Sequence, residues 1–456
     1  FSIIRSCDIV QADITTDTSD SYGIYIFSNS RNNNVTNNSI TTFGGLIDDN
    51  FGVYLTSTVF NNNVYNNNIT TSGGGGYGVR LDTTAYNNNI YSNVIRINNG
   101  GLSDANGIFL FTTSYNNLVY NNNITTSGLG DGVGVNNAYN NSVYNNIITT
   151  SGGSSTGVQL QNAYNNSVHN NIITTSGSTG TITSGGHGVM VYSSSYNNLV
   201  YNNTITTNNT HSSGIFLNGI IWNNTFYDNN ITTKNATGSY GIYLLDDIYN
   251  NTFFRNTISS LAGGIAINGS QSSANARARF NTFTNDTIVP CSIGCASNYN
   301  DILLTSNATD ITFTNVSFNK SRVAFVPRDL AVPVEINNMT VRWFMNVNVT
   351  NSTNNNAIAN AQVVINDSFS TNIFNGTTDA TGGIATQTVT EYTQNGSVKF
   401  TDLTDTCTDL KSNINITCFT PYNISVNITG YNPGNASIDV NRSKFVNLSM
   451  TITPAA

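Results

Sequence analysis

The sequence is poor in charge. Asp, Glu, Lys and Arg together make up 9% of its 456 residues, against about 25% in an ordinary soluble domain. Uncharged polar side chains, above all those of Asn, Thr and Ser, must therefore keep the chain in solution. The net charge of −8 is spread along the chain, and Lys and Arg form no run. We therefore expect neither nucleic acid nor an anionic membrane surface as a partner.

Long apolar runs are also absent. No stretch of 18 consecutive apolar residues occurs, so we predict no membrane-spanning segment. The chain opens on Phe1, as a processed or truncated product would, so the missing signal peptide does not argue for the cytoplasm. Lysine is scarce, and N-x-S/T acceptor sequences are dense. These features lead us to expect an extracellular or cell-surface protein.

Proline is nearly absent from the first 320 residues, and no segment shows the 3.6-residue period of an α-helix. A unit of 23 to 31 residues recurs instead. Each unit begins with a glycine and alternating apolar residues, as in Gly52-Val-Tyr-Leu. An aromatic residue and paired asparagines follow, as in Tyr139-Asn-Asn, and the unit closes as in Ile148-Thr-Thr-Ser-Gly. A repeat of this length indicates a solenoid.

The alternation within each unit, as in Val53 and Leu55, is the period of a strand with one buried face. Three such short strands per unit predict about eleven coils stacked at ~4.8 Å, a rod of ~50–55 Å. Asparagines at equivalent corners can form an amide ladder and tolerate the left-handed backbone. An aromatic column should stack along the rod: Phe60, Tyr86, Tyr115, Tyr139, Tyr164, Tyr196, Trp222 and Tyr249.

The recurring Gly-[Val/Ile]-x-[Leu/Val] and Asn-Asn-x-[Val/Ile]-x-x-Asn-x-Ile pattern resembles NosD-type, pectate-lyase-like right-handed parallel β-helix repeats of archaeal and bacterial surface proteins. The resemblance covers roughly residues 1–320. It also suggests copper binding by His187 and His211, 24 residues apart. Because a metal site needs a third ligand and none is evident, we favour two solvated loop histidines. We therefore expect no metal site and no cofactor.

The pattern changes after Phe280, and we predict an all-β chain in three parts. These are a parallel β-helix over residues 1–322, a Pro-containing linker over 323–334 and a small β-sandwich over 335–456. Asn360-Ala-Gln-Val-Val-Ile, Thr378-Asp-Ala-Thr-Gly and Tyr422-Asn-Ile-Ser-Val resemble the carboxypeptidase-regulatory-like (transthyretin-like) sandwich family. That resemblance implies a stalk, spacer or adhesion module rather than a catalyst.

The five cysteines divide into two close pairs and one left over. Cys291 is expected to pair with Cys295, and Cys407 with Cys418. Cys7 takes an asparagine corner of the first coil, so we expect a buried structural thiol there.

N-linked glycans are the first partner we expect. Within the repeat, chance in an Asn-, Ser- and Thr-rich chain is an equal explanation of the acceptor sequences, but in the C-terminal part they recur without a repeat that forces them. The candidates are Asn34, Asn68, Asn123, Asn230, Asn235, Asn307, Asn338, Asn348, Asn375, Asn395, Asn415, Asn423, Asn427, Asn435, Asn441 and Asn447.

Catalysis is not expected. Enzymes that cut polysaccharides on this fold need clustered acids, and here the acids are scattered. Asp82, Asp104, Asp131, Asp228, Asp246 and Asp247 do not recur in one strand column one coil apart.

We therefore predict a non-enzymatic structural protein, a glycosylated subunit of a cell-surface filament, sheath or surface layer. Aligning Ile14-Thr-Thr with the repeat places Phe1 inside a coil, so self-association head to tail is expected. The alternative is a carbohydrate-binding adhesin or a degenerate polysaccharide-active β-helix; NosD-like copper handling is a third possibility. Tyrosines that would line a sugar groove, or simply pack, are Tyr65, Tyr91, Tyr120, Tyr144, Tyr201 and Tyr227.

Overall fold

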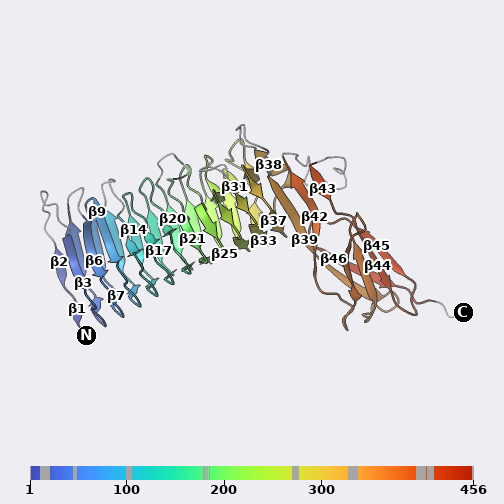
Figure 1. The fold of residues 1–456 in the computed structure, drawn as a ribbon, viewed down its shortest axis with the longest axis horizontal. Coiled ribbons are helices and arrows are strands. Elements are labelled where there is room, and N and C mark those ends of the chain that lie inside the picture. The colour runs from blue at the N-terminus through green and yellow to red at the C-terminus, as the bar shows by residue number, and fades with distance from the viewer. Residues whose placement is uncertain are drawn as a thin grey trace.

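The computed structural model describes residues 2–10, 21–44, 49–98, 105–177, 181, 183, 185–269, 277–326, 337–396, 407 and 415–453. Short strands stacked side by side form a long solenoid, and a small β-domain follows at its C-terminal end (Figure 1). The described elements are strands apart from one 3-10 helix, Lys320–Arg322. No described helix has the length and hydropathy to cross a membrane.

Each coil of the solenoid supplies one strand to each of three parallel sheets. The first sheet contains β1 (Ile3–Arg5), β4 (Asn34–Thr36), β7 (Asn63–Tyr65), β10 (Asn89–Tyr91), β13 (Leu118–Tyr120), β16 (Ser142–Tyr144), β19 (Ser167–His169), β22 (Leu199–Tyr201), β25 (Thr225–Tyr227), β29 (Thr252–Phe254), β33 (Thr282–Thr284) and β37 (Ile311–Thr314). The second contains β2 (Asp8–Val10), β5 (Ser39–Phe43), β8 (Asn68–Ser72), β11 (Val94–Asn98), β14 (Asn123–Thr126), β17 (Ile147–Thr150), β20 (Ile172–Thr175), β23 (Thr204–Thr207), β26 (Asn230–Thr233), β30 (Thr257–Ser260) and β34 (Thr287–Val289).

The third sheet has the longest strands of the solenoid and carries the candidate site. It contains β3 (Ser21–Phe27), β6 (Asp49–Thr56), β9 (Gly75–Leu81), β12 (Ile108–Phe111), β15 (Val133–Asn136), β18 (Val158–Gln161), β21 (Val189–Tyr196), β24 (Ile215–Trp222), β27 (Tyr240–Leu245), β31 (Gly263–Asn268), β35 (Asn300–Thr305) and β38 (Val323–Val326), with the short β28 (Ile248–Tyr249), β32 (Ala278–Arg279) and β36 (Ala308–Thr309) beside them. The predicted all-β parallel solenoid of about eleven turns is confirmed.

The core is built from columns, because successive coils pair in register. Val143 lies opposite Val168 of the next coil, and Ile148 lies opposite Ile173; all four side chains are fully buried. Towards the C-terminal end the first-sheet column changes from valine to phenylalanine, and these rings stack with centroids 4.6–5.0 Å apart. Burial of such side chains, at roughly 1.5–3 kcal/mol each, is the main force that holds the rod together.

Two ladders of buried asparagines run the length of the rod, as the corners of the repeat predicted. In each ladder Nδ2 donates to Oδ1 of the next coil over 2.9–3.2 Å. One ladder contains Asn33, Asn62, Asn88, Asn117, Asn141, Asn166, Asn198, Asn224, Asn251 and Asn281; the other contains Asn38, Asn67, Asn93, Asn122, Asn146, Asn171, Asn203, Asn229 and Asn256.

The residue before each ladder asparagine has a different role. Asn140 and Asn145, for example, precede Asn141 and Asn146 and have a φ of 55°. Only glycine, and asparagine more readily than most residues, adopts this left-handed conformation at low cost. The Asn-Asn pairs therefore combine a backbone corner with a hydrogen-bonded ladder rung.

Cys7 corrects one expectation. Its backbone N–H donates to Asn38 Oδ1 over 3.1 Å, which places it at the predicted corner. The thiol is free and exposed rather than buried, because it lies in the first described coil and no further described coil packs against its outer side.

The C-terminal domain is joined to the solenoid by one long strand, β39 (Asn338–Asn351). Its first part pairs in parallel with β37 of the last coil and antiparallel with β42 (Gln387–Asn395), and its second part pairs in parallel with β46 (Lys444–Met450). β43 (Ile416–Cys418) pairs with β42. A separate antiparallel sheet, the fourth, has the order β41 (Asn372–Thr377), β40 (Gln362–Asn366), β44 (Tyr422–Asn427), β45 (Gly434–Ile438).

The predicted linker over 323–334 begins too early, since Val323–Val326 forms β38 and pairs with β35 of the solenoid. The rest of that linker lies outside the described residues. A buried contact between the Lys320 ammonium and the Glu391 carboxylate ties the last coil to the domain, and the Trp343 indole donates to Glu391 Oε2 over 2.7 Å. Burial raises the pKa of Glu391, and Lys320 opposes that shift.

Both close cysteine pairs are bonded: Cys291 to Cys295 and Cys407 to Cys418. The first lies between β34 and β35 of the solenoid. The second links Cys407 to β43, and residues 408–414 between its cysteines lie outside the described part of the chain.

Candidate binding groove

The outer face of the third sheet carries large aromatic side chains towards both ends of the rod. On the N-terminal side Phe51, Tyr77 and Phe109 form a buried cluster. The guanidinium of Arg80 lies among these rings, 5.1 Å from the centroid of Tyr77, and pairs with Asp82 over 2.9 Å. Arg80 thus packs against aromatic rings while Asp82 neutralises its charge, and together these side chains cover that end of the face.

A second apolar block covers the C-terminal side of the same face. It contains Met190, Phe216, Tyr243, Leu245 and Ala266, all nearly or fully buried. Tyr192, Tyr240 and Leu303 pack against it.

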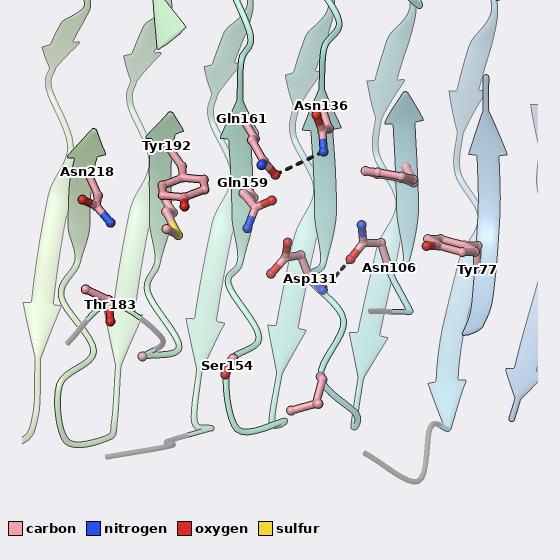
Figure 2. Close-up of a pocket in the computed structure, with 14 residues that line it drawn as sticks. Tyr77, Asn106, Asp131, Asn136, Ser154, Gln159, Gln161, Thr183, Tyr192 and Asn218 are labelled. Atoms are coloured by element: carbon pink, nitrogen blue, oxygen red, sulfur yellow. Dashed lines mark hydrogen bonds between the residues drawn. The ribbon is translucent and has the colours of Figure 1, made fainter. Parts of the chain in front are cut away.

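Between the two blocks, three successive coils present polar groups instead. Asn106, Asp131, Asn136, Gln159 and Gln161 face a groove of about 480 Å³ along β12, β15 and β18 (Figure 2). Loop residues Leu129, Ser154 and Gly185 line one side of it; Tyr77 and Asn218 stand at its two ends, and Tyr192 lies one coil before Asn218 (Figure 2). The groove is therefore a polar window in an otherwise apolar face.

Hydrogen bonds fix part of this window. Asn106 Oδ1 accepts from the Asp131 N–H, and Asp131 Oδ1 accepts from the Thr156 N–H, each over 2.7 Å. Asn136 Nδ2 donates to Gln161 Oε1 over 3.1 Å. Within the described structure, the side-chain amides of Gln159 and Asn218 have no hydrogen-bond partner. These two amides are therefore available to a ligand.

The glycine at position 134 allows this packing. A Cβ there would lie 2.6 Å from Asn106 Nδ2 and 2.8 Å from a ring carbon of Phe109. Without a side chain, Gly134 leaves room for both groups to lie over the strand.

The groove is nearly free of charge. Asp131 is the one carboxylate among its described lining residues, and no Lys, Arg or His lines it. A glycoside hydrolase would need two carboxyl groups placed on opposite sides of the bond that is cut. The geometry therefore suits binding of an uncharged ligand.

The tyrosines that the sequence offered as the lining of a sugar groove lie on the first sheet, and this groove lies on the third. The tyrosines Tyr65, Tyr91, Tyr120, Tyr144, Tyr201 and Tyr227 form a continuous stack on the first sheet, with His169 between Tyr144 and Tyr201. Ring centroids are 4.6–5.0 Å apart, so each ring face contacts the next ring and is not open to a sugar. The column from Phe60 to Tyr249 stacks in the same way, at 4.6–6.0 Å.

The sequence signal for this groove lies in the variable position of the Gly-[Val/Ile]-x-[Leu/Val] repeat. There Tyr54, Arg80 and Phe109 give way to Gly134 and Gln159, and apolar residues return at Met190. This position faces outward in every coil, so the change marks a stretch of the outer face with a different surface.

The expectation of two solvated loop histidines is wrong for His187. Its side chain is fully buried, its ring stacks on Phe216 at 4.2 Å, and its Nδ1 accepts from the Ser213 N–H over 3.0 Å. His211 is half-buried, in the loop before β24. Over the described ranges no three His, Cys, Asp or Glu side chains group as metal ligands would.

The sixteen candidate glycosylation sites are all at the surface. Nine are exposed: Asn68, Asn123, Asn230, Asn375, Asn395, Asn423, Asn427, Asn435 and Asn447. The other seven, Asn34, Asn235, Asn307, Asn338, Asn348, Asn415 and Asn441, are half-buried.

His169 makes the tyrosine stack sensitive to pH. Partial burial lowers its pKa below 6.5, so below pH 6.5 the unfolded chain takes up a proton before the folded one. We expect stability to fall as the pH drops from 6.5 through the lower folded pKa. Urea unfolding at pH 7.5 and pH 5 should show this loss in wild type and a smaller one in His169→Tyr, which restores the residue of the neighbouring coils. Equal pH dependence in both would contradict the assignment.

Comparison with known proteins agrees with the repeat. The family model described as periplasmic copper-binding protein (NosD) matches residues 95–282. No curated protein matches the chain. Among solved structures, the Dettilon tailspike protein is 13% identical with a TM-score of 0.45, over 92% of this chain and 74% of its own. Alginate lyase from Paenibacillus sp. str. FPU-7 is 11% identical with a TM-score of 0.34, over 71% and 96%.

At such identities and TM-scores, the two structures say nothing of what this chain binds. None of these comparisons supports the predicted carboxypeptidase-regulatory-like sandwich, which stays a prediction. The predicted resemblance to NosD-type β-helix repeats is confirmed by the match over residues 95–282.

Proposed function

We propose that this chain is a non-enzymatic extracellular protein that binds a carbohydrate chain in the groove of the third sheet. The observation that carries the proposal is the polar window between the aromatic block and the apolar block, with the free amides of Gln159 and Asn218 facing it. A sugar chain offers hydroxyls to amides and apolar ring faces to aromatic side chains. Few convergent polar groups among apolar ones are typical of small-ligand sites.

The class of carbohydrate follows from the charges. The described lining residues include no cationic side chain and one carboxylate, that of Asp131. The charges of an anionic polysaccharide would therefore find no partner here and would lie near this acid. We therefore propose an uncharged glycan. Between the coils of Tyr77 and Asn218 lie about five coil spacings, roughly 24 Å, which suits an extended oligosaccharide.

Other parts of the proposal concern assembly and metal. The C-terminal end of the solenoid is covered by β39 of the same chain, so a head-to-tail filament, sheath or surface layer would need another surface of the C-terminal domain. Self-association is best tested by electron microscopy of the assembled protein. Copper handling has less support, because the described residues group no set of three metal ligands.

Binding can be tested on an array of neutral and anionic glycans, followed by calorimetry with the best ligand. The double variant Gln159→Ala/Asn218→Ala should bind at least about fivefold more weakly, since each lost hydrogen bond contributes about 0.5–1.5 kcal/mol. Asn230→Ala, an exposed amide on the second sheet, is the matched control and should bind as wild type does. Affinity for an uncharged glycan should change little between low and high salt.

Two results would overturn the proposal. One is the absence of binding to any glycan, and the other is unchanged affinity of the double variant. Release of shortened glycan on long incubation would contradict the non-enzymatic part alone.

A further inference from the structure

The fourth sheet has one apolar and one uncharged polar face. Val363, Ile365, Ile424 and Val426 point inward and are fully or almost fully buried. The alternate positions face out, and on β40, β41, β44 and β45 they carry mainly amides and hydroxyls. No Asp, Glu, Lys or Arg occurs in these four strands.

Strand geometry turns this face into a set of glycan acceptors. Residues i and i+2 of a strand point to the same side, so an N-x-S/T sequence in a strand places its amide and its hydroxyl together on the outer face. Three such sequences lie within these strands, Asn375-Gly-Thr, Asn423-Ile-Ser and Asn435-Ala-Ser, and a fourth, Asn427-Ile-Thr, begins at the last residue of β44; the asparagine of each is exposed.

Strand pairing brings the four into one patch. Asn423 lies opposite Ser437, the hydroxyl residue that follows Asn435, and Asn435 in turn lies opposite Ser425, which follows Asn423. Asn427 and Asn375 lie opposite Gln362 and Val364 of β40, between them.

The two edge strands of this sheet lack charge and proline, and one register irregularity, between Ile365 and Asn366, interrupts the pairing of β41 with β40. An edge strand exposes unpaired N–H and C=O groups, which proteins commonly guard with charged side chains, proline or bulges. The edge strands β41 (NIFNGT) and β45 (GNASI) contain neither a charge nor a proline. Each contains one of the four acceptor asparagines, Asn375 and Asn435 respectively.

We propose that N-linked glycans on Asn375, Asn423, Asn427 and Asn435 cover the outer face of the fourth sheet and prevent its edges from pairing with another chain. In each transfer Nδ2 forms a bond to the anomeric carbon of a lipid-diphosphate-linked oligosaccharide. That carbon's bond to the diphosphate breaks, the lipid diphosphate leaves, and the amide loses one proton. Bulky hydrated glycans would supply the solubility that charge supplies elsewhere.

The first test is site occupancy. The full chain, secreted from a host that performs N-glycosylation, should yield glycopeptides for all four asparagines in mass spectrometry. Absence of glycans from these four sites would overturn the proposal, whether or not other sites are modified.

The second test separates edge protection from modification alone. Asn375→Gln/Asn435→Gln removes both edge acceptors and keeps an amide at each position; Asn423→Gln/Asn427→Gln removes the two acceptors of the inner strand β44. In sedimentation velocity over a concentration series, the edge variant should self-associate more than wild type and more than the inner variant. Equal sedimentation of the three proteins would refute the protective role.

Discussion

Replacing Asn146 by Ala is expected to lower the free energy of unfolding by about 3–5 kcal/mol, because it leaves several buried polar groups unpaired. The Asn146 side chain takes part in five hydrogen bonds. Its Oδ1 accepts from the N–H and Nδ2 of Asn122, and the two hydrogens of its Nδ2 are shared among Val119 O, Tyr144 O and Asn171 Oδ1, all over 2.9–3.0 Å. Urea unfolding at constant temperature measures the loss.

The neighbouring Asn145 provides the matched control. Its side chain is exposed, and its contribution is the left-handed corner, with a φ of 55°. Glycine adopts this conformation without strain, so Asn145→Gly should change stability by well under 1 kcal/mol. Hydrogen exchange in Asn146→Ala should increase most in the coils around residue 146, since each coil contacts only its neighbours. Similar destabilisation by the two variants would mean that the ladder adds little.

The second large effect concerns Asp286, which ends the second ladder. Its Oδ1 accepts from both the N–H and Nδ2 of Asn256, over 2.7 and 2.9 Å, whereas its Oδ2 is buried without a partner in the described structure. Burial raises the pKa of this carboxyl to about 7. Elsewhere in the ladder the corresponding Nδ2 donates back to a carbonyl, as Asn256 donates to Phe226 O. By the repeat, Phe253 O is the equivalent acceptor for residue 286, and only a protonated Asp286 can donate to it.

Asp286→Asn is therefore expected to stabilise the protein at neutral and alkaline pH. The unfolded carboxyl ionises near pH 3.8 and the folded one near pH 7, so the contribution of Asp286 is fully present below about pH 3.8 and is lost as the pH rises to about 7. The variant has no such group. The difference in unfolding free energy between the variant and wild type should therefore grow from about pH 3.8 to about pH 7. It should reach a few kcal/mol and stay constant at higher pH.

Unfolding of both proteins at pH 4, 5.5, 7 and 8.5 gives this difference directly. Asp301 and Glu391 are also buried carboxyls with raised pKa values, so wild type and variant will share some pH dependence. A difference between the two that does not vary with pH would show that Asp286 is ionised in the folded chain.

Much of the solenoid could be predicted from the chain because its rules are local and repeated. Alternation at i and i+2 decides which side chains enter the core, and a constant order of Gly, aromatic and Asn-Asn residues brings equivalent residues of successive coils into register. The valine, asparagine and tyrosine columns follow from that register alone. The rod therefore needs no contact that the repeat does not already encode.

Tertiary structure decided the features that depend on more than one column. Gln159 and Asn218 stand at variable repeat positions, and only stacking and the loop beside them make a groove. Burial of His187 results from Phe216 one coil away, and exposure of Cys7 from its place at the outer side of a coil. β39 lies within the range predicted for the sandwich, yet its first residues pair with β37 of the last coil. The sequence by itself determined the repeating coil, since that is a property of short-range order; the surface, the junction and the site depend on which side chains neighbouring coils, loops and strands bring together, and only the folded chain decides that.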